Sequence, residues 1–125
     1  MRSRLMLLPA AALLACGGGS DSTGLGTGGG GGGGTAAPTT ASVAASGSRF
    51  DPATVRVAKG GTITWTNSDG FAHNVTFPTG SGVASIATAD FGPGATKSAT
   101  MPAAAGSISY SCTIHAGMNG TITVE

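Results

Sequence analysis

From Ala41 to the C-terminus, the chain consists of short runs in which an apolar side chain alternates with a polar one, most often serine or threonine. This period-two pattern places successive side chains on opposite faces of an extended strand, one face buried and the other in water. The runs are Ser42–Ala44, Thr54–Val57, Thr62–Thr66, Asn74–Phe77, Thr96–Met101, Ser107–Cys112 and Thr121–Val124. No segment keeps a convincing helical period over three turns, so the sequence predicts an all-β fold.

Turn-forming residues separate these runs, as in Lys59-Gly60-Gly61, Asn67-Ser68-Asp69-Gly70 and Gly92-Pro93-Gly94. About seven to eight short strands joined by polar turns are typical of a Greek-key β-sandwich, because two packed sheets bury faces that one sheet would leave in water. The predicted core is Val55, Val57, Ile63, Trp65, Val75, Phe77, Ile108, Tyr110, Ile122 and Val124. Val83–Asp90 is expected to be either a short strand or a loop that crosses a sheet edge.

The composition limits the chain to one small domain and argues against a polyanionic partner. Of 125 residues, 23 are glycine, and twelve of these lie in Gly17–Gly34, which leaves roughly 85 residues to form a core. The formal net charge is +1, and from Ser42 onward four basic residues face four acidic ones. Nucleic-acid binding is therefore not expected.

The first residues have the layout of an export signal. Arg2 and Arg4 precede a largely apolar run that is too short to span a bilayer. Leu13-Leu14-Ala15-Cys16 resembles a bacterial lipobox, which predicts a signal peptide over residues 1–15 and lipidation of Cys16. The alternative is ordinary secretory cleavage. It prefers a small residue three positions before the cut, where this chain has Leu13.

Residues 16–41 are mostly Gly, Ser and Thr, and they are expected to form a flexible tether between the lipid and a domain over residues 42–125. Gly17 after Cys16 is not the aspartate that retains lipoproteins at the inner membrane in the families this resembles. The first expectation is an outer-membrane anchor facing the periplasm. The second is the extracellular face of a cytoplasmic membrane.

Three soft or borderline metal ligands lie close together near the C-terminus: Cys112, His115 and Met118. Gly117 and Gly120 argue against a helix there, so a tight loop is expected to turn the three side chains toward one centre. A structural zinc site would normally use more than one cysteine and no methionine. Copper suits a thiolate, two imidazoles and a weak thioether. The chain has two histidines, so the second imidazole would come from His73.

Residues from about Ala41 to Glu125 resemble a cupredoxin of the plastocyanin and amicyanin type. The resemblance includes Phe50-Asp51-Pro52, the stretch Lys59–Asn67, His73-Asn74-Val75, and a terminal pattern of Tyr110, Cys112, His115, Met118, Gly120, Ile122 and Val124. It implies one type 1 copper ion held by His73, Cys112, His115 and Met118. It also implies that Asn74 hydrogen-bonds across to the ligand loop, at Thr113. The implied function is one-electron transfer between envelope redox proteins, with His115 as the electron port.

Three further expectations follow. The family generally has proline directly before the loop histidine, where this chain has Ile114, whose N–H could donate to the Cys112 sulfur. Ile114→Pro is therefore expected to lower the reduction potential.

Phe71 is expected either in the core or in an apolar rim around the metal. The domain is expected to be monomeric and not an enzyme; copper carriage or storage, or an apo binding module, are the alternative functions.

Overall fold

The computed structural model describes residues 35–125. The expected signal peptide, Cys16 and the tether up to residue 34 lie outside the described residues. The first strand begins at Thr40, so the last two residues assigned to the tether, Thr40 and Ala41, belong to the sheet. Residues 35–125 contain no helix long and apolar enough to cross a bilayer.

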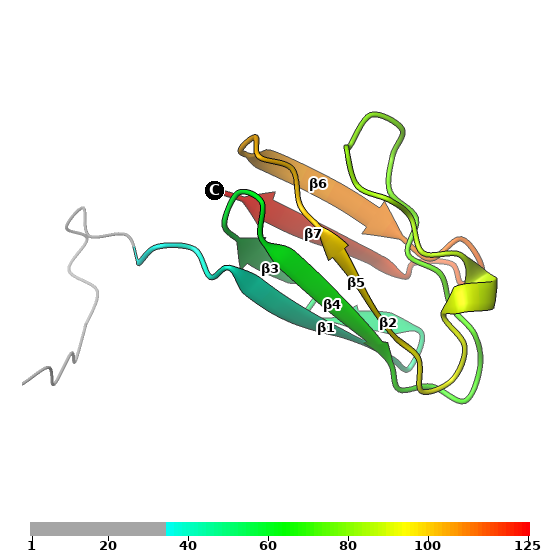
Figure 1. The fold of residues 1–125 in the computed structure, drawn as a ribbon. Coiled ribbons are helices and arrows are strands. Elements are labelled where there is room, and N and C mark those ends of the chain that lie inside the picture. The colour runs from blue at the N-terminus through cyan, green and yellow to red at the C-terminus, as the bar shows by residue number, and fades with distance from the viewer. Residues whose placement is uncertain (1–34) are drawn as a thin grey trace, which may run out of the picture. The chain divides into compact units, whose positions relative to one another are not determined.

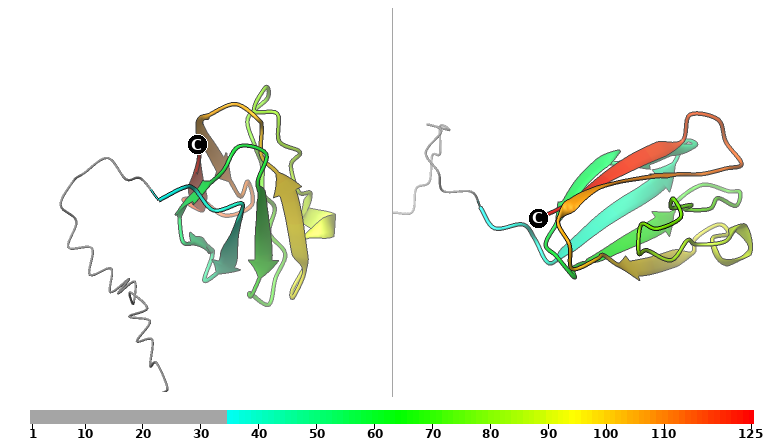
Figure 2. Two further views of the ribbon diagram at one scale, coloured as in Figure 1. Left: turned by 60° about the vertical axis from the view of Figure 1, so that its left-hand side comes forward. Right: turned by 90° about the horizontal axis from the view of Figure 1, so that it is seen from above.

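Seven strands form two sheets that pack face to face (Figures 1 and 2). In chain order they are β1 (Thr40–Ser46), β2 (Arg49–Asp51), β3 (Thr54–Val57), β4 (Thr62–Asn67), β5 (Thr96–Thr100), β6 (Gly106–Ser111) and β7 (Asn119–Val124). One sheet has the order β2-β1-β4-β5 and the other β3-β7-β6. The only helical element of the described residues is a 3-10 turn, η1 (Thr88–Asp90). The predicted all-β sandwich is confirmed.

The strand pairing explains how alternating sequences form one core. β1 and β4 are parallel, and β3 and β7 are also parallel, whereas β6 and β7 are antiparallel. These registers put apolar residues opposite each other, as in Val43 beside Trp65 and Val55 beside Ile122. Nine of the ten predicted core residues are buried, and Ile108 is partly buried against them. Residues that complete the core include Val43, Ala45, Phe50, Ile86, Phe91 and Met101.

The prediction was wrong for one strand and missed another. Asn74–Phe77 forms two isolated bridges, Val75 with Ile86 and Thr76 with Ser111, instead of a strand. Its alternation is real, since Val75 and Phe77 are both buried, but burial by a loop produces the same pattern as burial by a sheet. The missed strand is β2, whose three residues are too few for a period-two signal. Val83–Asp90 is a loop with one bridging residue, Ile86, and it ends in η1.

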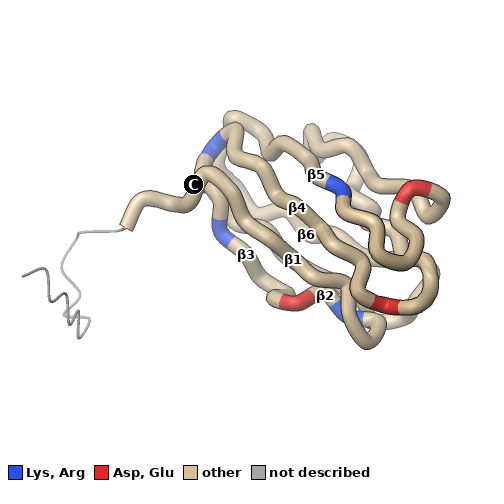
Figure 3. Tube along the Cα trace, turned by 60° about the horizontal axis from the view of Figure 1, so that its bottom comes forward, with Lys and Arg blue, Asp and Glu red and all other residues tan. Residues whose placement is uncertain are grey.

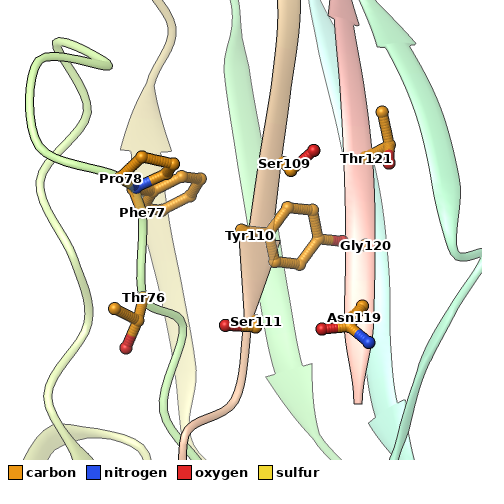
Figure 4. A pocket seen from close by; sticks show the side chains of 9 residues that line it. All are labelled: Thr76, Phe77, Pro78, Ser109, Tyr110, Ser111, Asn119, Gly120 and Thr121. Atoms are coloured by element: carbon orange, nitrogen blue, oxygen red, sulfur yellow. The ribbon is translucent and has the colours of Figure 1, made fainter. Parts of the chain in front are cut away.

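An aromatic cluster fills the space between the sheets. The ring of Tyr110 packs against Trp65, Phe77 and Phe50, with ring centroids 5.6, 5.6 and 4.8 Å apart. Figure 4 shows Tyr110 of β6 next to Gly120 of β7, beside a groove of about 450 Å³ that Phe77 and Pro78 also line. The tyrosine ring occupies the space that a side chain at position 120 would need.

Burial raises the pKa of the Tyr110 phenol, and this predicts an alkaline limit to stability. The group releases its proton more readily in the unfolded chain than in the native one. Its contribution is therefore fully present below the ordinary tyrosine pKa of about 10 and is lost as the pH rises above that value. Tyr110 is the chain's one tyrosine, so absorption at the tyrosinate band reports it alone. We expect tyrosinate to appear together with unfolding above pH ~10; ionisation in a chain that stays folded, at an ordinary pKa, would contradict this.

Candidate metal centre

The four predicted ligands lie at one end of the sandwich, where β4 and β6 end and β7 begins (Figure 1). His73 lies in the segment that follows β4. Cys112 directly follows β6, and His115 and Met118 lie in the loop between β6 and β7. β4 and β6 belong to different sheets, and both end here. The segment that follows β4, with His73, therefore meets the loop that follows β6.

Three donor atoms converge on one point. The Nδ1 atoms of His73 and His115 are 3.1 Å apart. The Cys112 sulfur lies 3.8 Å from the first of these nitrogens and 3.6 Å from the second. His73 and Cys112 are buried and His115 is partly exposed. The three side chains thus form a small triangle of two imidazole nitrogens and one sulfur.

This triangle has the size that a transition metal needs. A point equidistant from the three atoms lies about 2 Å from each, within the range of metal–nitrogen and metal–thiolate bonds, about 2.0–2.3 Å. Imidazole and thiolate are borderline and soft donors, which suit copper or zinc and not calcium or magnesium. The residues present therefore fit a copper ion with no rearrangement of the backbone.

Met118 is held in the same loop by main-chain hydrogen bonds. Its amide donates to the His115 carbonyl at 3.3 Å, and the Cys112 amide donates to the Met118 carbonyl at 2.9 Å. Gly117 has φ +77°, a left-handed conformation that glycine adopts without strain. The tight loop predicted from Gly117 is thus formed, and the Met118 side chain is wholly buried.

Asn74 links the two segments that carry the ligands, as expected from its resemblance to the family asparagine. Its amide nitrogen donates to the Thr113 hydroxyl at 2.7 Å, and its carbonyl oxygen accepts from the Thr113 amide at 2.9 Å. Thr76 and Thr88 add hydrogen bonds at 3.1 and 3.2 Å. The residue that follows His73 is therefore fixed to the residue that follows Cys112.

Asn67, the last residue of β4, and Asp69, in the turn that follows, constrain the segment that carries His73, and no role was predicted for either. The buried Asn67 side chain donates to the carbonyls of Phe71 and Phe91 at 2.8 and 3.0 Å. The Asp69 carboxylate lies 2.8 Å from His73 Nε2. Hydrogen bonds from the amides of Ser48 and Gly47, and then from His73, hold the pKa of the Asp69 carboxyl below its usual value. The only sequence signal was the position of Asp69 four residues before a candidate ligand.

Two exposed apolar side chains lie at this end of the domain. Phe71 and Ile114 are 46% and 49% exposed. The ring of Phe71 lies 5.0 Å from the His73 ring and 5.2 Å from the His115 ring, measured between centroids. Of the two placements expected for Phe71, the structure shows the one at the surface.

In the part of the chain that the structure describes, no hydrogen bond joins the Ile114 amide to the Cys112 sulfur, although one was expected. The sulfur faces the nitrogens of His73 and His115 instead. The expected fall in reduction potential for Ile114→Pro therefore has no support in the structure.

This chain is similar in sequence to known plastocyanins and amicyanins. Residues 38–125 match the family model of copper-binding proteins of the plastocyanin/azurin family. Plastocyanin of Scenedesmus fuscus is 39% identical over 85 residues, which cover 61% of this chain and 86% of that protein. Amicyanin-alpha of Methylorubrum extorquens is 35% identical over 80 residues, covering 62% of this chain and 65% of that protein.

The similarity extends to three dimensions. A solved structure of an amicyanin mutant in its reduced state superposes with a TM-score of 0.61 at 30% identity, covering 69% of this chain and 82% of the amicyanin. The family match spans the whole sandwich and includes all four predicted ligands. This chain belongs to the plastocyanin/azurin family of copper-binding proteins, the cupredoxins.

Proposed function

We propose that this chain is a blue-copper electron carrier and transforms no substrate. His73, Cys112 and His115 would hold the copper ion, and the thioether of Met118 would be a further, weaker ligand. The observation that carries the proposal is the convergence of two imidazole nitrogens and one thiol sulfur at distances of 3.1–3.8 Å. Bound copper supplies a one-electron couple between Cu(I) and Cu(II), which such a mixed donor set serves in both states.

The protein's own contribution is a ligand set that is held before the metal arrives. Asn74 fixes the two ligand-bearing segments to each other, and the Cys112 sulfur is shielded from water at 4% residue exposure. Rigid ligands change little between oxidation states. The partly exposed His115, beside the exposed Phe71, is the route by which an electron reaches the surface.

Burial of the ligands favours electron transfer over copper carriage or storage. A protein that hands copper to another would present its donors at the surface. Here His73, Cys112 and Met118 are all buried. The remaining methionine of the described residues, Met101, is also buried and lies outside the ligand loop.

Voltammetry of the copper-loaded chain tests the proposed function. We expect one reversible one-electron wave, because oxidation and reduction leave the ligand set in place. The zinc-loaded chain is the control and should show no wave. A copper-loaded chain that gives only irreversible release of copper on reduction would show a cargo protein and contradict the proposal.

We further propose that the domain is carried to the envelope and tethered there through lipidated Cys16, with the outer membrane as the first choice of anchor. The support is the lipobox-like Leu13-Leu14-Ala15-Cys16 and the glycine-rich residues after it. Several acyl chains give stable membrane attachment. Cys16→Ser should release the protein from the membrane fraction, and retention of this variant in the membrane would contradict lipid anchoring.

Docking to redox partners is expected to depend little on salt. The four basic and four acidic residues of the domain are spread over its surface without a single-sign cluster (Figure 3). Long-range steering needs such a cluster, so contact is expected to rest on apolar surface around His115, with Phe71, Pro78, Ala116 and Gly117. The electron-transfer rate with a partner should change less than about threefold between low and physiological ionic strength. A fall of several tenfold would show a charged docking surface.

A further inference from the structure

The Asp69 carboxylate lies at the meeting point of three hydrogen bonds. It accepts from the Gly47 amide at 2.7 Å and from the Ser48 amide at 3.1 Å. Its Oδ2 atom lies 2.8 Å from His73 Nε2. The Asp69 side chain is 12% exposed and that of His73 is fully buried. The contact therefore excludes water from the far side of the imidazole.

The anchor for this carboxylate is the turn between β1 and β2. Gly47 and Ser48 both have positive φ, +59° and +57°. Two consecutive left-handed residues are typical of the tight turn that joins two antiparallel strands. In this turn both amides face Asp69 instead of water. The turn thus fixes the carboxylate, although it lies more than 20 residues away in the sequence.

The hydrogen bond to Asp69 decides which nitrogen of His73 is free. An ionised carboxylate only accepts hydrogen bonds, so Nε2 must carry the proton in the neutral ring. The unprotonated nitrogen is then Nδ1, which is the atom that faces the Cys112 sulfur and His115. A metal needs this lone pair.

We propose that Asp69, anchored on the Gly47–Ser48 turn, is a positioning residue that keeps His73 in the Nε2-protonated form with Nδ1 directed at the metal. The inference rests on the proposed function for the identity of the metal. The protonation of His73, however, can also be measured in the metal-free chain. Outer partners of metal-bound histidines typically contribute 10–100-fold to metal affinity.

Asp69→Ala is the sharpest variant because it removes both carboxylate oxygens. The Gly47 amide donates to Oδ1, whereas the Ser48 amide and His73 Nε2 share Oδ2. An asparagine at this position can place its oxygen where Oδ2 lies and keep Nε2 protonated, whereas alanine leaves Nε2 without this acceptor. The proton of the neutral ring then divides between the two nitrogens. Asp90→Ala is the matched control, with the same loss of charge and no hydrogen bond to His73.

The first measurement is 15N NMR of the imidazoles in the full metal-free chain, where only two histidines have to be assigned. In the unsubstituted chain we expect His73 to carry its proton on Nε2, with Nδ1 unprotonated. Asp69→Ala should divide the proton between Nε2 and Nδ1, and Asp90→Ala should leave it on Nε2. An Nδ1-protonated His73 in the unsubstituted chain would overturn the proposal whether or not any variant folds.

The second measurement is copper affinity by competition with a chelator. Asp69→Ala should bind copper 10–100-fold more weakly than the unsubstituted chain, and Asp69→Glu should recover part of the loss. Affinity within twofold of the unsubstituted chain for Asp69→Ala would overturn the proposal. If the tautomer is as expected but the copper-loaded chain shows no reversible wave, the proposed function fails and the role of Asp69 stands.

Discussion

Cys112→Ser should abolish the intense visible absorption that the Cu(II)-loaded chain is expected to show. That band arises from charge transfer between a thiolate and copper, and Cys112 supplies the one thiol among the converging donors. Serine is slightly smaller and fits the same buried place, so the fold should survive. The visible spectrum after addition of Cu(II) measures the effect, with circular dichroism as the check on folding.

The matched control is Cys16→Ser, which removes the chain's other thiol and should leave the band at full intensity. A band that persists in Cys112→Ser would show that copper binds elsewhere. A band that disappears in Cys16→Ser would show that the domain's own ligands are not sufficient.

Gly120→Ala is expected to destabilise the domain, because Gly120 of β7 leaves no room for a methyl group. A Cβ at this position would overlap the ring and hydroxyl of Tyr110, which packs directly over Gly120. The ring also packs against Trp65, Phe77 and Phe50, so a shift away from position 120 disturbs these contacts. Overpacking of this kind costs about 1–3 kcal/mol. The midpoint of thermal unfolding should fall by several degrees.

Gly92→Ala is the control, because a Cβ there meets no atom within 4 Å and the backbone is not left-handed. Its free energy of unfolding should remain within about 0.5 kcal/mol of the unsubstituted chain. Urea unfolding followed by Trp65 fluorescence compares the variants. Equal stability of Gly120→Ala and Gly92→Ala would show that Tyr110 can move aside.

The sheets could be predicted because strands such as β4 and β7 alternate buried side chains with more exposed ones. Trp65, Ile122 and Val124 show the period-two pattern in the sequence and lie in the core of the structure. Asn74–Phe77 shows the same pattern without being a strand. Alternation reports burial, and it carries no information on whether a neighbouring backbone supplies the hydrogen bonds of a ladder.

The convergence of His73, Cys112 and His115 could be predicted because the chemistry of copper limits which residues can hold it, and this chain has only two histidines. The link from Asn74 to Thr113 followed from resemblance to a family. The role of Asp69 could not be predicted, because its carboxylate looks like ordinary turn chemistry in Asn67-Ser68-Asp69-Gly70. Its partners Gly47 and Ser48 are brought to it only by the pairing of β1 with β2 and β4. The orientation of the Ile114 amide depends on loop dihedral angles that the sequence does not specify.

X-ray absorption at the copper edge tests the central claim most directly, because it reads the atoms bound to the metal. For the chain loaded with one equivalent of Cu(II), the triangle of His73, Cys112 and His115 predicts two copper–nitrogen bonds and one short copper–sulfur bond. Cys112→Ser should lose the short sulfur bond alone. A spectrum of the unsubstituted chain with only nitrogen and oxygen neighbours would contradict the account.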